Sequence, residues 1–256
     1  MLTEERYEKT LSKLEERKSV SVQELADEFS VSTETIRRDL VFLESKGKLK
    51  RVFGGAIKGG ELRRFHDYSQ RMIENRDKKT QLCKTAASLI EERDIIAIDS
   101  GSTANVLVDV LLEKFDKLTV ITPSLDVFLK LKDKFTVIFS GGEYYEKEHT
   151  FYGELAVSAI SRLHANKCFI FPSAVSLTHG IEDYVPMLIP IQKIMMEISD
   201  RIFILADSTK YGKRALVKLT AADPDFIYVT DNELDDDIYE KYSKKIYIVK
   251  GESSNE

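Results

Sequence analysis

Residues 31–56 of this 256-residue chain read VSTETIRRDLVFLESKGKLKRVFGGA. Within this stretch Ile36, Leu40 and Leu43 recur at the spacing of one helical face, which predicts an α-helix with a buried apolar stripe. Ser32 stands just before the stripe, where its hydroxyl oxygen can accept a hydrogen bond from a free backbone N–H of the first turn. The stretch therefore predicts a short helix that begins at Ser32.

The outward face of this predicted helix carries short hydroxyl groups and two guanidinium groups. Thr33, Thr35, Arg37 and Arg38 lie on it. Arginine forks pair with phosphate oxygens and with the O6 and N7 edge of guanine in a major groove. This composition favours a helix that reads DNA. The alternative is a surface helix whose arginines are only solvated, and the flanking sequence bears on the choice.

Two further helices are predicted upstream. The first covers about residues 3–17, and the second begins at Ser21 with an apolar inner face over residues 22–29. Only residues 30–31 separate this second helix from the one that begins at Ser32. Two short helices joined by so tight a turn are typical of a helix-turn-helix, which presents its second helix to DNA.

A basic hairpin is predicted downstream of the same helix. Residues 48–52 alternate basic and apolar side chains, which is typical of a strand with one buried face. Gly54 and Gly55 then permit a tight turn, so the segment indicates a small β-wing with Arg51 among its cations. Although the net charge of the chain is −5, residues 30–58 carry seven Lys and Arg against three Asp and Glu. This local charge balance favours DNA binding.

Residues 24–56 also match a known pattern. They contain E-L-A, V-S-x-x-T-I-R-R-D-L, L-E-x-x-G-x-L-x-R-V and G-G-A in an ungapped run. In this the chain resembles the winged helix-turn-helix of DeoR-type bacterial transcription regulators. The resemblance implies double-stranded operator DNA as a partner, and it places the DNA-binding residues on the helix and the wing: Ser32, Thr33, Thr35, Arg37, Arg38, Arg51, Gly54 and Gly55.

Composition places the chain among globular proteins without a membrane span. It is 43% hydrophobic and 32% charged, and it has no apolar run long enough to cross a bilayer, which predicts a cytoplasmic protein. Cys83 and Cys168 lie far apart in the sequence, and the four histidines show no metal-ligand spacing. We therefore expect two reduced core thiols, no metal site and no cofactor.

Three regions are predicted along the chain: a winged helix-turn-helix domain over residues 1–58, a charged linker over residues 59–78 and an α/β domain over residues 79–256. The composition of the linker fits either a loose segment or a solvated helix. In the last region short apolar runs alternate with helical patterns, which predicts a mainly parallel sheet with helices on both faces. Residues 142–153 interrupt this alternation and are predicted to form a hairpin or flap. The predicted strands are residues 95–98, 118–121, 135–139, 167–171, 202–206, 226–229 and 246–249.

Ligands of α/β sheets bind beyond the carboxyl ends of the strands, and small residues follow several predicted strands here. Residues 99–103 directly precede a helix, where a glycine lets backbone N–H groups approach an anion. The carboxylate of Asp99 suits sugar hydroxyls or anchoring of the loop, and the lysine at 210 can meet a phosphate. Each turn can equally need its Gly and Ser for structural reasons alone. The candidate effector-binding residues are Asp99, Ser100, Gly101, Ser102, Thr103, Thr122, Ser124, Gly141, Gly142 and Lys210.

The same strand ends resemble the effector domain of the DeoR family, which is related in fold to sugar-phosphate isomerases. Residues 99–103 match its D-x-G-S/T-T loop, residues 141–142 its G-G pair and residues 207–210 its D-S-S-K segment. Pro123 departs from the family's T-N-S segment. The resemblance implies a phosphorylated sugar effector and a repressor of sugar-metabolism genes. Because paired modules on repeated half-sites reach useful specificity, we also expect a homodimer or homotetramer.

Two other functions remain open for the second half of the chain. It can be an isomerase-like enzyme fused to a DNA-binding module, which would need a carboxylate placed to move a proton next to a carbonyl group. Asp99, Asp183 and Asp207 are the possible carboxylates, but none belongs to a recognisable acid–base constellation. It can also be a domain that only oligomerises. We expect a sensor without catalytic residues, and an assay of sugar-phosphate turnover separates it from an enzyme.

Overall fold

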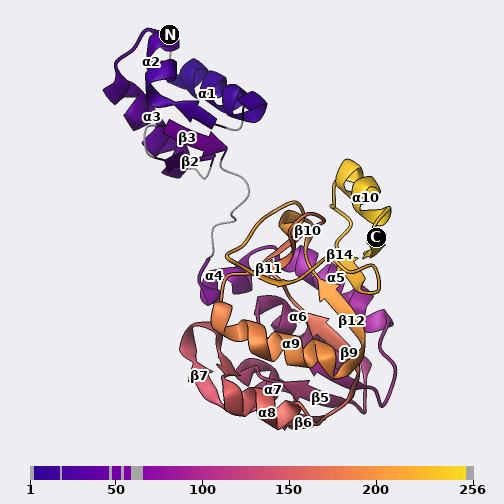
Figure 1. The fold of residues 1–256 in the computed structure, drawn as a ribbon. Helices are drawn as coiled ribbons and strands as arrows, with labels where there is room; N and C mark the ends of the chain where they lie inside the picture. Colours follow the sequence, from indigo (N-terminus) through magenta and orange to yellow (C-terminus); the bar gives the residue numbers. More distant parts are fainter. Residues whose placement is uncertain (1–2, 18, 46–47, 53–54, 59–65, 252–256) are drawn as a thin grey trace. The chain divides into compact units, whose positions relative to one another are not determined.

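The computed structural model describes residues 3–17, 19–45, 48–52, 55–58 and 66–251. It divides the chain into two units, residues 1–64 and residues 65–256, and each is described here by itself (Figure 1). Within the described part of the chain no helix is long and apolar enough to cross a membrane.

The first unit consists of three helices and a small antiparallel sheet. The strands lie in the order β1-β3-β2, so the hairpin predicted as a wing is present and its second strand also pairs with the short strand between the first two helices. The elements are α1 (Thr3–Arg17), β1 (Ser19–Ser21), α2 (Val22–Phe29), α3 (Thr33–Ser45), β2 (Leu49–Val52) and β3 (Gly55–Lys58).

Both predicted helix starts are confirmed by their hydrogen bonds. The Ser21 hydroxyl oxygen accepts the backbone N–H of Glu24 at 3.0 Å at the start of α2. The Ser32 hydroxyl oxygen accepts the backbone N–H of Thr35 at 3.1 Å at the start of α3. Between the helices Ser30 adopts a left-handed conformation with φ 54°, which closes the tight turn. These caps set where the two helices begin and hence the turn between them.

The predicted apolar stripe of α3 lies in the core of the first unit. Ile36, Leu40 and Leu43 are buried together with the inner face of α2. One ion pair is buried beside this core: the guanidinium of Arg6 in α1 holds the carboxylate of Asp39 in α3, with Nη2 3.0 Å from Oδ1. Apolar packing and this ion pair therefore seat α3 against α1 and α2.

The second unit is built on a seven-stranded sheet in which every neighbouring pair is parallel, in the order β15-β14-β12-β9-β4-β5-β6. The seven predicted strands are confirmed, and they are the seven strands of this sheet. Their bounds are β4 (Ile95–Ile98), β5 (Thr119–Thr122), β6 (Thr136–Phe139), β9 (Ala165–Ile170), β12 (Ser199–Leu205), β14 (Ile227–Thr230) and β15 (Tyr247–Lys250).

Helices cover both faces of this sheet, as the alternation of patterns predicted. On one face lie α5 (Arg76–Ser88), α6 (Ser102–Lys114) and α7 (Leu125–Leu131). On the other face lie α8 (Glu154–Ile160), α9 (Ile189–Glu197) and α10 (Asp236–Ser243). Figure 1 shows α9 across one side of β9 and β12, with α6 behind the strands.

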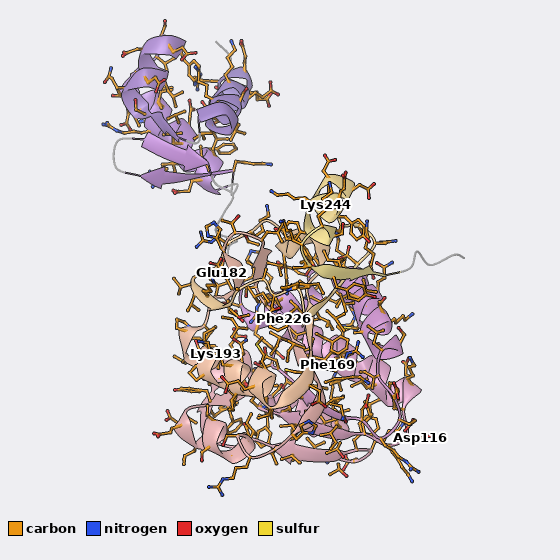
Figure 2. All side chains as sticks on the ribbon, turned by 45° about the vertical axis from the view of Figure 1, so that its right-hand side comes forward. Asp116, Phe169, Glu182, Lys193, Phe226 and Lys244 are labelled. Atoms are coloured by element: carbon orange, nitrogen blue, oxygen red, sulfur yellow. The ribbon has the colours of Figure 1, made fainter. Side chains whose placement is uncertain are left out.

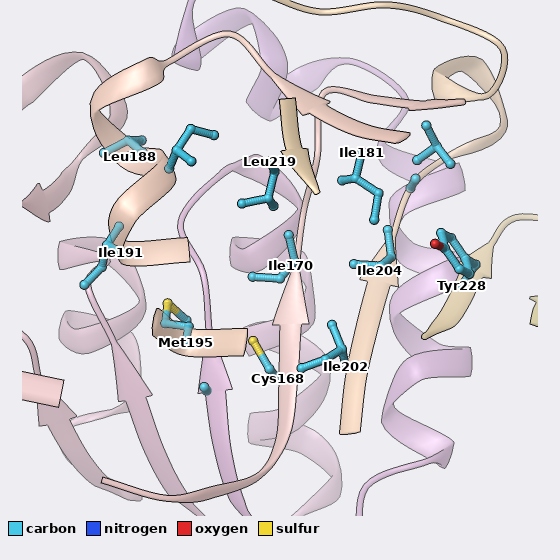
Figure 3. Close-up of a cluster of buried hydrophobic side chains, with 14 of the residues drawn as sticks. Cys168, Ile170, Ile181, Leu188, Ile191, Met195, Ile202, Ile204, Leu219 and Tyr228 are labelled. Atoms are coloured by element: carbon cyan, nitrogen blue, oxygen red, sulfur yellow. The ribbon is translucent and has the colours of Figure 1, made fainter. Parts of the chain in front are cut away.

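Successive residues of one strand belong to different cores. Phe169 of β9 packs with the α5–α7 side, whereas Cys168 and Ile170 pack with the α8–α10 side. Figure 3 shows the second of these cores, where Cys168 and Ile170 lie beside Met195 of α9. In Figure 2 Phe169 lies in the interior, and the exposed side chains of Lys193 and Lys244 lie at the periphery. Each strand is therefore apolar on both sides, as a parallel sheet between helices requires.

Two smaller pieces accompany the sheet. The predicted hairpin in residues 142–153 is present as β7 (Glu143–Tyr145) paired antiparallel with β8 (Thr150–Tyr152), joined by the 3₁₀ turn η1 (Glu146–Glu148). A second antiparallel sheet, not predicted from the sequence, packs on the α8–α10 side; it consists of β10 (Ala174–Ser176), β11 (Gly180–Asp183) and β13 (Val217–Thr220).

Part of the segment predicted as a linker is helical. Residues 68–73 form α4 (Tyr68–Ile73), and α5 begins at Arg76, so the end of the 59–78 segment belongs to the second unit. Tyr68 is buried although the surrounding sequence is highly charged. Tyr68 is held by hydrogen bonds to residues far from it in the sequence. Such contacts do not show in the charge composition of the segment, from which the linker was predicted.

Candidate functional site

The arginines predicted to bind DNA are exposed on α3. The side chain of Arg37 is 63% exposed and that of Arg38 is 81% exposed. Both lie near the carboxylate of Glu34, at 3.8 Å and 3.5 Å. Exposed pairs of this kind contribute little free energy, so both guanidinium groups can exchange Glu34 for the phosphates or bases of DNA.

The hydroxyl groups at the start of α3 serve the helix itself. The Ser32 and Thr35 hydroxyls lie 2.8 Å apart, and the Ser32 oxygen also caps the helix. Thr33 is half-buried at the first position of the helix. The structure thus gives Ser32 a structural role at the N-terminal end of α3, and any contact of Ser32 or the threonines with DNA remains a prediction.

The predicted wing residues have different surroundings. Arg51 donates its backbone N–H and its Nε–H to the carboxylate of Glu44, at 2.8 Å and 2.7 Å, which ties β2 to the end of α3. Gly55 is buried in β3, where an added Cβ would lie 2.1 Å from the carbonyl oxygen of Val20. This close approach of β1 requires a glycine. Gly54 lies outside the described residues.

In the second unit the order of the strands reverses between β4 and β9. From β4 the sheet extends through β5 and β6 on one side and through β9 and β12 on the other. The predicted residues that follow β4 and β5 therefore lie at adjacent carboxyl ends, and those that follow β12 lie beyond β9, on the other side of the point where open α/β sheets bind ligands. The parallel sheet brings together the β4, β5 and β12 members of the predicted set.

Gly101, at the end of β4, is the residue before α6. Its φ is +130° and its ψ is 170°, a conformation open essentially to glycine alone. No side chain caps the start of α6, and an added Cβ on Gly101 would meet nothing within 4 Å. Ser100, Ser102 and Thr103 beside it are buried. An anion at this point would lie at the N-terminus of a 13-residue helix, and Gly101 itself is buried.

Asp99 lies beside this helix start and is fully buried. Its Oδ1 accepts the backbone N–H of Ser100 at 2.7 Å, and its Oδ2 accepts Nε2–H of Gln192 at 2.9 Å. The same amide donates to Asp183 at 3.1 Å, while Gln192 Oε1 has no hydrogen-bond partner among the described residues. Burial, with a smaller contribution from the charge of Asp183 and against the hydrogen bond from Gln192, raises the pKa of Asp99 to about 7. Asp99 therefore changes charge near neutral pH.

The predicted residues at the end of β5 have internal partners. The Thr122 hydroxyl donates to the carbonyl oxygen of Ile98 at 2.7 Å and accepts the backbone N–H of Ser124 at 3.1 Å. The Ser124 hydroxyl oxygen caps α7 by accepting the N–H of Val127 at 3.3 Å. Both hydroxyls are buried and serve to join β5 to β4 and to start α7.

The two glycines after β6 also differ. Gly142 has φ +103°, and an added Cβ would lie 2.5 Å from the carbonyl oxygen of Tyr152 and 2.8 Å from Cβ of Ala156. It is needed for the packing of the β7–β8 hairpin on α8. Gly141 has φ +60° and open space at its Cβ position, so close approach of a ligand is sterically possible only at the first of the pair.

Lys210 follows β12 and is buried. Its Nζ donates to the carbonyl oxygen of Pro172 at 2.7 Å, which ties the end of β12 to the end of β9. A lysine in this setting supplies positive charge to the strand ends and holds them together. Whether it also contacts an effector stays a prediction.

Sequence reasoning missed a polar network on this edge of the sheet. Tyr68 of α4 donates its hydroxyl to Oδ2 of Asp126 at 2.6 Å and accepts Nδ2–H of Asn105 at 2.7 Å. The tyrosine ring stacks on His149 with ring centroids 4.7 Å apart, and His149 Nδ1 lies 3.2 Å from Asp126. Asn105 and Gln192 each interrupt an apolar helical pattern, and that was the signal by which they could have been found.

Both cysteines are buried and free, Cys83 in the α5–α7 core and Cys168 in the α8–α10 core. Burial raises the pKa of each thiol. Across the residues that the structure describes, no group of three or more His, Cys, Asp or Glu is arranged to hold a metal ion.

Two family descriptions match most of the chain. Residues 6–58 match the DeoR-like helix-turn-helix domain, and residues 74–232 match the DeoR C terminal sensor domain. The chain is 31% identical to the HTH-type transcriptional regulator GolR of Listeria innocua over 93% of this chain and 94% of that protein. It is 32% identical to the lactose phosphotransferase system repressor of Lactococcus lactis over 96% of this chain and 98% of that protein.

Among solved structures, ribose 5-phosphate isomerase A from Neisseria gonorrhoeae is similar to 58% of this chain and 57% of its own, at 18% identity and a TM-score of 0.41. This likeness is weak and concerns the fold alone. The regulators above are similar over nearly their whole lengths, so the isomerase-like enzyme considered from the sequence is not supported. Because both domain families match in order and the named relatives are transcriptional regulators, the chain belongs to the DeoR family of transcriptional regulators and is not an enzyme.

Proposed function

We propose that this regulator is a repressor of sugar-metabolism genes that binds operator DNA through α3 and the β2–β3 wing and is released by a phosphorylated sugar. The observation that carries the effector site is the start of α6 at Gly101, which no side chain caps and where an added Cβ would meet nothing within 4 Å, beside the buried carboxylate of Asp99. The similarity to the lactose phosphotransferase system repressor of Lactococcus lactis supports both repression and a sugar-related signal.

The two kinds of group at this edge suit the two ends of a sugar phosphate. Backbone N–H groups in the first turn of α6 and the positive end of its dipole favour a phosphate. Asp99 and Asp183 would repel a phosphate but accept hydrogen bonds from sugar hydroxyls, and Gln192 holds both carboxylates in place. The phosphate is therefore assigned to Gly101 and the polyol to the carboxylates.

We also propose that the regulator acts as a homodimer or homotetramer. One winged helix contacts a short stretch of duplex, whereas two modules on repeated half-sites multiply both affinity and specificity. Sedimentation velocity of the full chain, alone and with operator duplex, measures the assembly directly. A monomer under both conditions would contradict this proposal.

The substitution Gly101→Ala tests the effector site. A methyl group here would occupy the open space beside the helix start, and the positive φ would strain the loop. We expect the variant to keep its operator affinity but to need an at least about tenfold higher concentration of sugar phosphate for release, the equivalent of one lost hydrogen bond to a charged group. Fluorescence anisotropy with a duplex selected from a random pool gives both numbers.

The effectors to be tested form a panel of glucose 6-phosphate, fructose 6-phosphate, ribose 5-phosphate and glycerol 3-phosphate. Each is compared with its dephosphorylated form. Gly212→Ala is the matched control, because Gly212 also has a positive φ (+69°) and open space at its Cβ position but lies against Val175 and Tyr242. If the Gly101 variant responds to the panel as the wild type does, the effector binds elsewhere.

A further inference from the structure

The guanidinium group of Arg71 in α4 contacts residues on either side of a long stretch of sequence, among them Glu148 and His66. Its Nη2 donates to both carboxylate oxygens of Glu148, at 2.6 Å and 2.5 Å. Its Nε donates to the backbone carbonyl oxygen of His66 at 3.0 Å. Glu148 is buried at the end of the η1 turn between β7 and β8. One side chain thus joins α4, the β7–β8 hairpin and the first described residue of the second unit.

The position of His66 makes this contact relevant to the DNA-binding unit. Residues 59–65 connect His66 to the last strand of the first unit, so the chain enters the second unit at the carbonyl that Arg71 holds. The other end of α4 is fixed independently, because Nζ of Lys79 donates to the carbonyl oxygens of Arg71 and Glu74. A change of partner by the guanidinium would therefore act first on the chain around His66.

One chain of contacts and one electrostatic relation connect Arg71 with the start of α6. The guanidinium carbon lies 5.5 Å from the centre of the Tyr68 ring, and Tyr68 is bonded to Asn105 in the first turns of α6. The backbone N–H of Asn105 in turn donates to the carbonyl oxygen of Gly101 at 3.4 Å. The electrostatic relation is that the charge of Asp183 raises the pKa of both Glu148 and Asp99.

Charge balance gives the guanidinium a reason to change partners. The carboxylates of Asp99, Asp126, Glu148 and Asp183 lie around this edge of the second unit, where the Nζ of Lys210 donates to the carbonyl oxygen of Pro172, so a phosphate at Gly101 would gain from a further cation beside the helix N-terminus. Arginine binds carboxylate and phosphate through the same planar fork, and a phosphate offers it more charge and more acceptor oxygens. A phosphate can therefore displace Glu148 as the partner of the guanidinium group.

We propose that Arg71 is a phosphate-binding residue of the effector site, and that its transfer from Glu148 to the phosphate releases the His66 carbonyl and so changes the operator affinity of the DNA-binding unit. This inference rests on the proposed function, because it takes the effector's phosphate to bind at Gly101. It adds a residue from outside the predicted strand-end set and a route by which binding reaches the other unit.

Two variants of the full chain that break the same ion pair test this proposal, with inorganic phosphate as the probe. Arg71→Gln removes the cation, and we expect phosphate affinity to fall at least about tenfold. Glu148→Gln removes the competing carboxylate and leaves the cation, and we expect phosphate affinity to rise by about the same factor. Arg71→Lys keeps the charge without the fork and should lie between the wild type and Arg71→Gln. Titration calorimetry measures the affinities.

The expected changes in phosphate affinity have opposite signs in Arg71→Gln and Glu148→Gln, and this separates a binding role of Arg71 from a structural one. If the Arg71–Glu148 pair only stabilised the fold, both variants would change phosphate affinity in the same direction or not at all, and either result overturns the proposal. Asp94→Asn is the control for stability, since Asp94 forms a buried pair with Lys167 at the amino ends of the strands. It should destabilise the unit without changing phosphate affinity.

Operator binding supplies the second readout. Arg71→Gln should bind operator with nearly the same affinity with and without inorganic phosphate, whereas phosphate weakens operator binding by the wild type. A wild type that ignores inorganic phosphate overturns the role of Arg71. The sugar-phosphate panel and Gly101→Ala test the proposed function separately. If a sugar phosphate releases operator but the Arg71 variants have no effect, the proposed function is retained and the role of Arg71 is rejected.

Discussion

Replacing Arg37 and Arg38 together with alanine is expected to weaken operator binding by at least about 30-fold. Each guanidinium that reads a base contributes about 1–3 kcal/mol, and both side chains are more than half exposed on the outer face of α3. Among the described residues of the first unit their ion pairs are the weak contacts with Glu34, so removing them leaves the core of the unit intact. Fluorescence anisotropy with selected operator duplex measures the loss.

The salt dependence of binding then separates the kinds of contact. An arginine that binds phosphate lowers the slope of log affinity against log salt by about 1 when removed, on every sequence. An arginine that reads a base instead lowers discrimination at one position. Lys9→Ala on α1 is the matched control, because Lys9 is a half-exposed cation of the same unit in an exposed pair with Glu5. Unchanged affinity in the double arginine variant would show that α3 does not contact DNA.

The second large effect is expected from Asp39→Asn, inside the first unit. This change leaves the Arg6 guanidinium buried without the carboxylate that holds it, and breaking a buried pair in this way costs about 3–5 kcal/mol. Since the pair joins α1 to α3, we expect α3 to lose its place against α1. Hydrogen exchange of the α3 backbone amides in the full chain measures the free energy of opening.

An exposed pair in the same unit provides the comparison. Glu5→Gln removes one partner of the Lys9–Glu5 pair on the surface of α1, and its cost should stay below about 0.5 kcal/mol. Operator affinity should fall with Asp39→Asn and stay unchanged with Glu5→Gln. Equal exchange protection of α3 in the two variants would mean that the buried pair does not seat the helix.

Much of the fold could be predicted because short-range patterns determine it. Each strand of the large sheet is apolar on both faces, so the run around Phe169 or Ile96 stands out from the polar turns on either side. Ser21 and Ser32 indicate where α2 and α3 begin, because a cap bonds within three residues. Such signals need no knowledge of the tertiary structure.

The parts that could not be predicted depend on contacts between distant residues. The strands β10, β11 and β13 are three or four residues long, and the pairing of β11 with β13 joins segments that are about 40 residues apart in sequence. The helix α4 lies in a charged segment, and its burial depends on the bonds of Tyr68 to Asn105 and Asp126. Neither length nor composition shows such contacts.

At the candidate effector site, too, local sequence signals predicted some features, and contacts between distant residues determine the others. A glycine before a helix indicates the accessible start of α6, and the structure has open space at Gly101. Thr122 and Ser124 are also small residues after a strand and were predicted to bind the effector, yet their hydroxyls bond to Ile98 and Val127 within the fold. Residue type alone cannot separate these cases. Arg71 and Glu148, 77 positions apart, were missed because each is one charged residue among many.

The central claim is that one chain couples an effector site at the β4 strand end to operator binding by α3, and reciprocal titration of the wild type tests it most directly. Operator affinity is measured with and without saturating sugar phosphate from the panel, and sugar-phosphate affinity is measured with and without saturating operator. Thermodynamic linkage requires the two ratios to be equal, and the proposed repressor predicts that each ligand weakens the other by the same factor, greater than 1. Ratios of 1 for every sugar phosphate of the panel would contradict the claim.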